Sequence, residues 1–125
     1  MATILVVDDE FGIAELFSAI LADEGHRVLA ATNGKHGLEM LAGERADLIY
    51  LDHMMPVMSG LAMLGRIAAD PTLRHIPVVL MSGMPEPAVI ERASGCASFL
   101  RKPFRVAQIV ALTGRLLVRA PRLAE

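Results

Sequence analysis

Residues 48–56 have the sequence Leu48-Ile49-Tyr50-Leu51-Asp52-His53-Met54-Met55-Pro56. The first four side chains are apolar or aromatic without alternation, a pattern that indicates a strand covered on both faces, as in a parallel sheet. Asp52 follows this strand directly. We therefore expect its carboxylate to be held at the carboxyl end of the strand, oriented and only partly hydrated.

Four other short runs share this composition. Together with Leu48–Leu51 they predict five strands, the others being Ile4–Val7, Arg27–Ala31, Val78–Met81 and Ala97–Leu100. The segments between them have the helical period, with apolar residues three and four positions apart. They predict five helices: Phe11–Glu24, Lys35–Leu41, Leu61–Ala69, Pro87–Ser94 and Phe104–Val118.

Residues that end or cap helices mark some of these boundaries. Gly25 is suited to end the first helix. Asn33 and Ser59 precede the second and third helices and can accept hydrogen bonds from their first free amide groups. The helix over Pro87–Ser94 has the weakest support, because two prolines open it and a glycine closes it early.

The order of elements is a strand followed by a helix, repeated five times. Helical crossovers are almost always right-handed, so this order predicts an α/β fold of the doubly wound type, a parallel sheet with helices on both faces. Sheets of this kind bind ligands at the carboxyl ends of their strands. A chain of 125 residues fits one domain, which we expect over residues 1–119, followed by a C-terminal tail over residues 120–125.

The composition limits the function. The formal net charge of −2 gives no indication of a nucleic acid or an anionic membrane as partner. The single cysteine, Cys96, rules out an internal disulfide and a cysteine-based metal cluster, and its neighbours predict a small buried residue. No apolar stretch approaches the roughly 20 residues of a membrane span, and the apolar run at the N-terminus is too short for a signal peptide. We therefore expect a cytoplasmic protein.

Polar residues follow four of the five expected strands. The first is followed by Asp8 and Asp9, the third by Asp52, the fourth by Ser82 and the fifth by Lys102. The fold would bring them to one edge of the sheet. Carboxylates close together repel one another unless a cation neutralises them, and oxygen ligands favour Mg²⁺. The alternative, acids that only cap the following helix, is weakened because Asp52 and Lys102 lie in the same register.

These residue types suit phosphoryl transfer. An oriented carboxylate at Asp52 can attack a phosphoryl donor and form an acyl phosphate. The reaction mainly requires positioning and charge neutralisation, and Lys102 offers a compact cation in a chain with ten Arg and two Lys. Ser82 can donate a hydrogen bond to a phosphoryl oxygen. Pro103 restricts the residue before it, and a cis Lys102–Pro103 bond would aim the amine.

Four motifs in this order resemble the receiver domains of bacterial response regulators. They are an acidic pair after the first strand, Asp-x-x-Met-Pro at 52–56, Ser-Gly at 82–83 and Lys-Pro-Phe at 102–104. The resemblance extends from Ile4 to about Leu117. It implies a flavodoxin-like (βα)5 fold with a five-stranded parallel sheet of order 2-1-3-4-5. It also implies a phospho-acceptor switch of two-component signalling, with a sensor histidine kinase or phosphotransfer protein upstream and a protein target or output domain downstream.

The resemblance further implies a metal site. Asp52 would accept the phosphoryl group and would bind Mg²⁺ together with Asp9 and the backbone carbonyl of Met54. Asp8 would act mainly through water.

The same resemblance implies a switch. Ser82 and Lys102 would bind the phosphoryl group, because the new charge favours the state in which they have closed on it. Phe99 would turn inward when the Ser82 hydroxyl moves, which alters the surface of the fourth helix, fifth strand and fifth helix. Without the surrounding motifs, Phe99 would be interpreted as an ordinary core aromatic.

Two methionines depart from the pattern of the family. Met54 and Met84 occupy positions beside the acceptor where polar side chains often place the hydrolytic water, and we hypothesise that apolar side chains there slow loss of the phosphoryl group. Two prolines stiffen the loop after the fourth strand. His53 is expected to face a helix or solvent rather than to act as a ligand, and the other three histidines have no metal-ligand spacing.

Three alternatives belong to other classes. A Mg²⁺-dependent aspartyl phosphotransferase or phosphatase needs a second acid two residues after the nucleophile, where this chain has Met54. A flavodoxin-like cofactor binder needs a phosphate loop after the first strand, where acids would repel a phosphate. A degenerate receiver that acts only as an interaction module is disfavoured by the complete acceptor set. We expect no enzymatic turnover, although the domain would assist its own phosphorylation and dephosphorylation.

The C-terminal part of the chain is basic. Residues 101–125 carry six Lys and Arg and one acid, which we interpret as a solvated helix face rather than a binding arm. A homodimer through the fourth helix, fifth strand and fifth helix is a further expectation, although surface ion pairs contribute little. The basic side chains would be Arg101, Arg105 and Arg115, and their partners Glu86 or Glu91 of a second copy. The chain length fits either a stand-alone receiver or part of a longer regulator.

Overall fold

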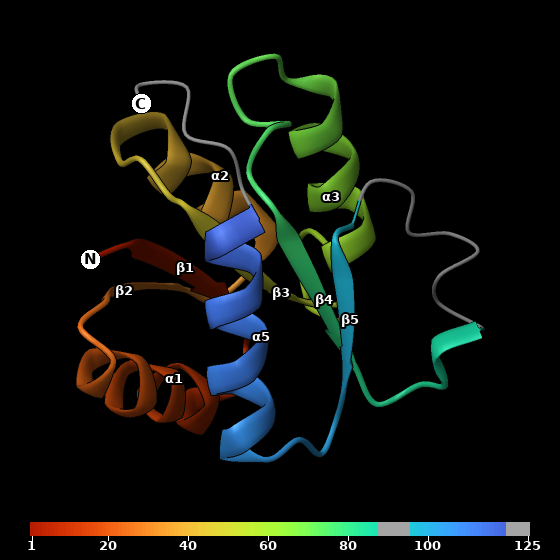
Figure 1. Ribbon diagram of the computed structural model, residues 1–125. Coiled ribbons are helices and arrows are strands. Elements are labelled where there is room, and N and C mark those ends of the chain that lie inside the picture. The colour runs from red at the N-terminus through yellow and green to blue at the C-terminus, as the bar shows by residue number, and fades with distance from the viewer. Residues whose placement is uncertain (88–95, 120–125) are drawn as a thin grey trace.

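The computed structural model describes residues 1–87 and 96–119 of the chain. Strands and helices alternate from the N-terminus to β4, and β5 and α5 complete the described elements (Figure 1). In chain order, the elements are β1 (Thr3–Val7), α1 (Phe11–Asp23), β2 (Arg27–Ala31), α2 (Gly34–Gly43), β3 (Leu48–Asp52), α3 (Gly60–Ala69), β4 (Val78–Ser82), β5 (Ser98–Arg101) and α5 (Val106–Arg119). Among these helices, none has the length and apolar character needed to cross a membrane.

The strands form one five-stranded sheet with the order β2-β1-β3-β4-β5. Every neighbouring pair is parallel. The predicted α/β fold and its strand order are therefore confirmed. Because all strands run the same way, their carboxyl ends meet at one edge of the sheet, and the residues that follow them are brought together there.

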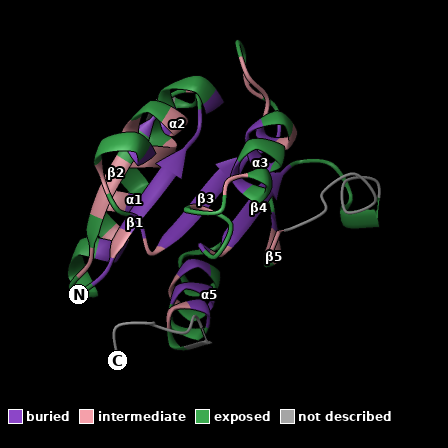
Figure 2. Cartoon of the chain, turned by 90° about the horizontal axis from the view of Figure 1, so that it is seen from above, coloured by how far each residue is buried: buried purple, intermediate pink, exposed green. Residues whose placement is uncertain are grey.

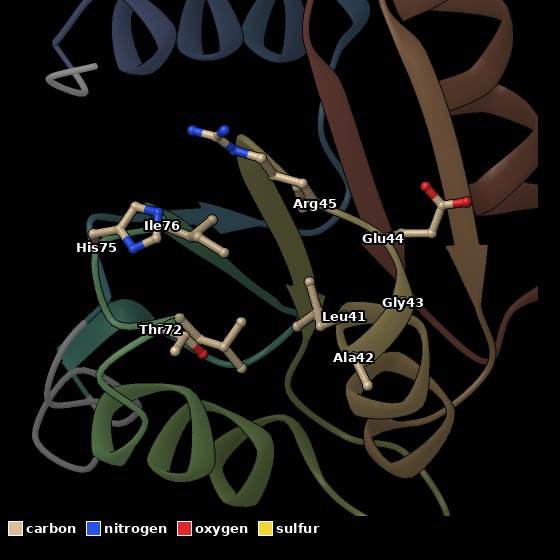
Figure 3. A pocket seen from close by; sticks show the side chains of 10 residues that line it. Leu41, Ala42, Gly43, Glu44, Arg45, Thr72, His75 and Ile76 are labelled. Atoms are coloured by element: carbon tan, nitrogen blue, oxygen red, sulfur yellow. The ribbon is translucent and has the colours of Figure 1, made fainter. Parts of the chain in front are cut away.

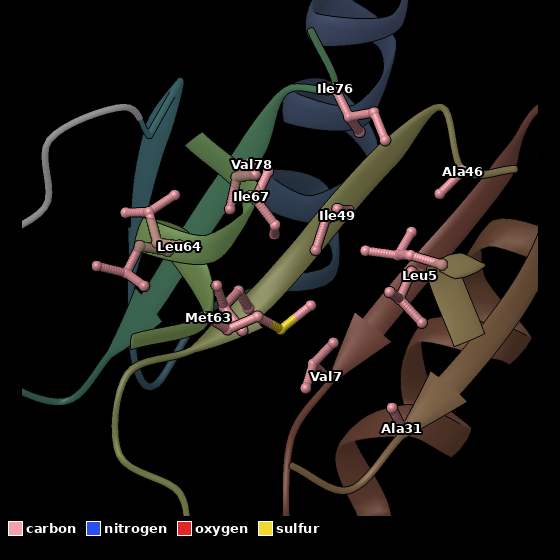
Figure 4. Packing of buried hydrophobic residues seen from close by; sticks show 13 residues of the cluster. Leu5, Val7, Ala31, Ala46, Ile49, Met63, Leu64, Ile67, Ile76 and Val78 are labelled. Atoms are coloured by element: carbon pink, nitrogen blue, oxygen red, sulfur yellow. The ribbon is translucent and has the colours of Figure 1, made fainter. Parts of the chain in front are cut away.

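Two clusters of apolar side chains cover the two faces of the sheet. On one face, which we call the α2/α3 face, strand residues pack against α2 and α3 (Figure 4), and they include Leu5, Val7, Ile49, Leu51, Val78 and Leu80. On the other, the α1/α5 face, strand residues pack against α1 and α5, and they include Ile4, Val6, Tyr50, Val79, Met81 and Leu100. Figure 2 shows β1, β3 and β4 buried along almost their whole length, with the outer sides of the helices exposed. The unbroken apolar runs of the sequence are therefore strands covered on both faces.

Tyr50 connects β3 to α5 through hydrogen bonds of its hydroxyl group. Its side chain is fully buried, with its ring centroid 4.7 Å from that of Phe17. The hydroxyl lies 2.6 Å from Thr113 Oγ1 and also donates to the Ile109 carbonyl at 3.4 Å. Burial raises the pKa of Tyr50 to about 12, although the Thr113 hydrogen bond acts against this. The aromatic residue in the middle of β3 therefore fills the core without leaving its polar tip unpaired.

The predicted helix caps are present. The Asn33 side chain accepts a hydrogen bond from the His36 amide at 2.9 Å, and Ser59 Oγ accepts one from the Ala62 amide at 3.2 Å. After α1 the chain turns at Gly25, whose φ of 85° suits glycine. These local signals therefore set the start of α2 and α3 and the end of α1.

Several boundaries differ from the sequence expectation by one or two residues. β1, β3 and β4 are one residue longer, and β5 begins at Ser98 rather than Ala97. α5 begins at Val106 rather than Phe104. The Arg105 amide, just before the helix, donates a hydrogen bond to the Gln108 side chain at 2.7 Å, and this contact marks the start of the first turn. The helix expected over Pro87–Ser94 falls, except for its first residue, outside the described residues, as does the expected tail.

A close backbone contact joins α3 to the end of β3. The Gly60 amide donates to the His53 carbonyl at 3.0 Å. A Cβ atom at Gly60 would overlap the carbonyl oxygen of Asp52 and would lie 3.0 Å from the Cα of His53. The first residue of α3 therefore has to be glycine for the helix to pack directly against the backbone that carries Asp52.

We predict that Gly60→Ala lowers the free energy of unfolding by about 1–3 kcal/mol, because the added methyl group overpacks against backbone that cannot yield. Gly65→Ala in the same helix is the matched control. Nothing lies within 4 Å of its added Cβ, so it should stabilise the protein by up to about 1 kcal/mol through helix propensity. Chemical denaturation measures both, and equal effects of the two substitutions would contradict the contact.

Candidate functional site

Charged side chains from the ends of β1, β3 and β5 meet at the carboxyl edge of the sheet. The Lys102 ammonium nitrogen lies 2.9 Å from Asp8 Oδ2 and 3.2 Å from Asp52 Oδ1. It also lies 3.4 Å from Oε1 of Glu10, whose side chain is mostly exposed. Lys102 and Asp8 are 94 positions apart in sequence, so the contact depends on the fold.

The alternation of side chains along the strands explains this arrangement. Val6, Tyr50 and Leu100 belong to the α1/α5 face, and residues two positions further along point to the same side. Those residues are Asp8, Asp52 and Lys102. Asp8 and Asp52 are only 3% and 5% exposed. The strands therefore place two buried carboxylates and one ammonium group on the same side of the sheet, in contact with one another.

The pKa of Asp52 is raised from its ordinary value of 3.8 to about 6. Burial is the main cause and the charge of Asp8 adds to it, while the charge and hydrogen bond of Lys102 act in the opposite direction. For Lys102, burial by itself would lower the pKa. Its hydrogen bond to Asp8 and the charges of Asp52 and Asp8 outweigh burial and raise the pKa above the ordinary range. The pKa of Asp52 is therefore set by burial and by Asp8 together, against the opposing effect of Lys102.

The acids form a set that can hold a divalent cation. Asp8, Asp9 and Asp52 each offer a carboxylate oxygen, and these three atoms lie within 4.8 Å of one another. Asp9 is exposed, whereas Asp8 and Asp52 are buried. Hard oxygen ligands that are partly open to water fit Mg²⁺, which retains several waters when bound. The residues present therefore fit the predicted metal.

The backbone at the end of β5 is held against β4. The Lys102 amide donates to the Ser82 carbonyl at 2.8 Å, and the Lys102–Pro103 peptide bond is cis. Directly after it, the Phe104 ring packs edge-on against Phe17, with ring centroids 5.6 Å apart. The turn that carries Lys102 is therefore anchored on both sides, by a strand and by the core.

The Ser82 hydroxyl is directed away from this charged group. Ser82 is 2% exposed, and Leu80, two positions before it, belongs to the α2/α3 face. Its Oγ atom accepts a hydrogen bond from the Met84 amide at 3.0 Å and lies 3.1 Å from Nδ1 of His53. The structure thus places Ser82 at the expected edge of the sheet, with its hydroxyl bonded on the α2/α3 side.

The sequence predicted that His53 faces a helix or solvent, but it did not predict its polar partner. His53 directly follows β3 on the α2/α3 side, is 9% exposed, and its ring contacts the Ser82 hydroxyl. The signal was present in the spacing. His53 follows Leu51 by two positions just as Ser82 follows Leu80, and Leu51 and Leu80 are register partners on the same face.

Four other residues discussed in the sequence analysis differ in their exposure. Phe99 is half-buried and packs against the α2/α3 cluster. Met54 and Met84 are 66% and 43% exposed. Cys96 is half-buried, and burial raises the pKa of its thiol, which suits an unreactive structural cysteine.

A tight turn links Asp52 to α3. The Met58 amide donates to the Pro56 carbonyl at 2.7 Å, across a Val57 whose φ is 68°. This left-handed conformation is strained for a β-branched residue. Val57 is also 78% exposed, so packing of its side chain does not account for the conformation. The strain therefore lies in the backbone segment that leads from β3 into α3.

A hollow also exists at the opposite edge of the sheet (Figure 3). It has a volume of about 490 Å³ and is lined by residues that precede β3 and β4, together with the end of α2. Arg45, His75 and Ile76 contribute to its wall. It lies at the amino ends of the strands, and it is therefore separate from the charged group around Asp52.

The chain is similar in sequence to known signalling proteins. A family model described as the response regulator receiver domain matches residues 4–113. The two-component response regulator ORR7 of Oryza sativa subsp. japonica is 37% identical over 117 residues, which cover 91% of this chain and 56% of that protein. The two-component response regulator ORR3 of Oryza sativa subsp. indica is 34% identical over 119 residues, which cover 93% of this chain and 91% of that protein. The chain thus spans about half of one relative and most of the other.

The fold is also similar to solved structures. The signal receiver domain of a signal transduction histidine kinase from Syntrophus aciditrophicus matches with a TM-score of 0.90 and 31% sequence identity. The match covers 98% of this chain and 94% of that one. The likeness therefore extends over the whole parallel sheet and its helices.

We predict that Asp52→Asn stabilises the protein above pH 6 in metal-free buffer, by up to about 3 kcal/mol. The folded pKa of about 6 lies above the ordinary value of 3.8, so the folded state binds the proton more tightly and the wild type loses stability as pH rises between these values. The gain should therefore shrink as pH falls from 6 to 4. Urea denaturation at several pH values measures it, with the exposed Asp23→Asn as control for net charge. A gain that does not change with pH would contradict the assignment.

Proposed function

The chain belongs to the response regulator receiver domain family, and from this we propose that Asp52 is the residue that accepts the phosphoryl group. The observation that carries the proposal is the position of the Lys102 ammonium, 2.9 Å from Asp8 and 3.2 Å from Asp52. A carboxylate at the end of a buried strand, beside a fixed cation, has the two properties that phosphoryl transfer requires, positioning and charge neutralisation.

In the proposed reaction an Asp52 carboxylate oxygen attacks the phosphorus of a phosphohistidine in the donor protein. The new bond is an acyl phosphate, and the bond that breaks joins phosphorus to the imidazole nitrogen of the donor. Lys102 neutralises charge on the transferred oxygens. Its contact with Asp8 holds the ammonium in place before the donor arrives, so little reorganisation is needed.

The acids beside Asp52 would supply the metal site. Asp8, Asp9 and Asp52, together with the backbone carbonyl of Met54, would hold Mg²⁺, which when bound neutralises the acids and polarises the phosphoryl oxygens. The convergence of the three carboxylates supports this assignment. The charges at this edge also support it, because three carboxylates converge and one ammonium group, that of Lys102, contacts two of them.

Phosphorylation would shift the domain between two states. The acyl phosphate would bind Ser82 and Lys102, and Phe99 would move toward the space that the Ser82 hydroxyl leaves. Phe99 packs only partly buried against the α2/α3 cluster, which leaves its ring room to change position. The result would be read by a partner from β5, α5 and the segment between β4 and β5.

The partners follow from the same proposal. A sensor histidine kinase or phosphotransfer protein would supply the phosphoryl group, and a downstream protein or output domain would respond. The domain would assist its own phosphorylation and dephosphorylation without turning over a substrate. The cytoplasmic location, the absence of a nucleic acid partner and the homodimer stay predictions, and Glu91, one acid of the expected dimer contact, lies outside the described residues.

We predict that acetyl phosphate with Mg²⁺ adds one phosphoryl mass to the wild-type chain and none to Asp52→Asn, because that variant lacks the nucleophilic carboxylate. Asp23→Asn, which changes an exposed acid on α1, is the matched control and should be modified like the wild type. Intact-mass spectrometry measures all three, with excess chelator as a further arm in which modification should fall.

A mass gain that persists in Asp52→Asn would show that another residue accepts the group. A gain in the wild type that is unaffected by chelator would leave Asp52 as acceptor but would remove the metal from the proposal.

We also predict that Met54→Asn combined with Met84→Glu speeds loss of the phosphoryl group by about tenfold or more. Both methionines are exposed and offer no polar atom that orients an attacking water, whereas the replacements do. Decay of the phosphorylated species, followed by intact mass after removal of the donor, measures the rate. Val106→Gln, which makes another exposed apolar side chain polar, is the control. An unchanged decay rate in the double variant would count against the role of the methionines.

A further inference from the structure

His53 and Ser82 form a polar pair beside the apolar α2/α3 cluster. The His53 Nδ1 and Ser82 Oγ atoms lie 3.1 Å apart, and the residues are 9% and 2% exposed. The strand side chains before them, Leu51 and Leu80, are fully buried and belong to the α2/α3 cluster. A hydrogen bond in such surroundings is costly to break without a replacement, because the groups cannot turn to bulk water.

This pair lies on the opposite side of the sheet from the acceptor carboxylate. Asp52 follows Tyr50 of the α1/α5 face, whereas His53 and Ser82 follow residues of the α2/α3 face. The Met84 amide also donates to the Ser82 hydroxyl, at 3.0 Å. Two contacts therefore hold the hydroxyl on the side away from the charged group.

We infer that His53 is a positioning residue that holds the Ser82 hydroxyl away from Asp52 in the unphosphorylated state, and so opposes the switch. The inference rests on the proposed function, because it concerns the hydroxyl that would bind the phosphoryl group. To reach a group on Asp52, the Ser82 hydroxyl has to leave His53. This holds whichever of the two atoms donates the hydrogen, because the movement itself separates them.

The consequence is a shift in the equilibrium between the two states. A ligand that binds only one state has an apparent affinity reduced by the fraction of that state. Removing a buried hydrogen bond that exists only in the unphosphorylated state should therefore raise apparent affinity for a phosphoryl mimic by about 3- to 10-fold. The same change should speed phosphorylation by a small-molecule donor if the transition state already uses the Ser82 hydroxyl.

The test uses beryllofluoride, which binds a carboxylate as an analogue of the phosphoryl group, with Mg²⁺ and ¹⁹F NMR as the readout. His53→Phe keeps a planar ring and removes the hydrogen-bonding nitrogen, and His53→Leu repeats the test with a smaller apolar side chain. Both should bind about 3- to 10-fold more tightly than the wild type. His75→Phe, the same substitution at an exposed position in the loop before β4, should bind like the wild type.

Two further variants separate positioning from packing. His53→Asn keeps a polar atom near the place of Nδ1 and should return the affinity to within about twofold of the wild type. In a Ser82→Ala background, His53→Phe should have no effect, because the hydroxyl on which it acts is gone. An effect of His53→Phe that persists without the Ser82 hydroxyl would overturn the inference, as would an Asn variant as tight as the Phe variant.

The outcomes also separate this inference from the proposed function. A wild type that binds beryllofluoride, with His53→Phe and His53→Leu binding equally or more weakly, would refute the role of His53 and leave Asp52 as the acceptor. A wild type that binds none would refute both.

Discussion

The contact between the Lys102 ammonium and the two buried carboxylates of Asp8 and Asp52 is the constraint on which the rest of the site depends. Without a cation, two acids that are 3% and 5% exposed could not both stay charged at this edge of the sheet. Burial, and then the charge of Asp8, raise the pKa of Asp52 despite the opposing effect of Lys102. Three carboxylates converge beside this one ammonium group, and they fit a divalent ion.

The parallel sheet makes this contact possible. Parallel strands place their carboxyl ends together, and because side chains alternate along each strand, the polar groups that follow the strands lie on two opposite sides of the sheet. The charged group lies on the α1/α5 side, and the Ser82 hydroxyl with His53 lies on the α2/α3 side. In the proposed switch, the hydroxyl would move from one side to the other. Phosphorylation would then be linked to a rearrangement at the end of β4 rather than to a change in the whole sheet.

Much of this could be predicted from the sequence because the signals are local or periodic. Unbroken apolar runs predicted the buried strands, and Asn33 and Ser59 predicted the starts of two helices, since each caps by a hydrogen bond within three residues. The start of α5 was placed too early because the hydrogen bond between the Arg105 amide and Gln108 carries no apolar signal. The partner of His53 was not predicted, because Ser82 is 29 positions away. The need for glycine at position 60 depends on a contact with the backbone of another element, which becomes visible only in three dimensions.

The identity of the phosphorylated residue is the most direct test of the role proposed for Asp52. Borohydride reduces an aspartyl phosphate to homoserine, and peptide mass spectrometry then locates the converted residue. After treatment with acetyl phosphate and Mg²⁺, homoserine should appear at position 52 and depend on Lys102, so that Lys102→Ala gives much less of it. Homoserine at position 8 or 9, or an equal yield of homoserine at position 52 in Lys102→Ala, would contradict the central role given to the contact between Lys102 and the buried acids.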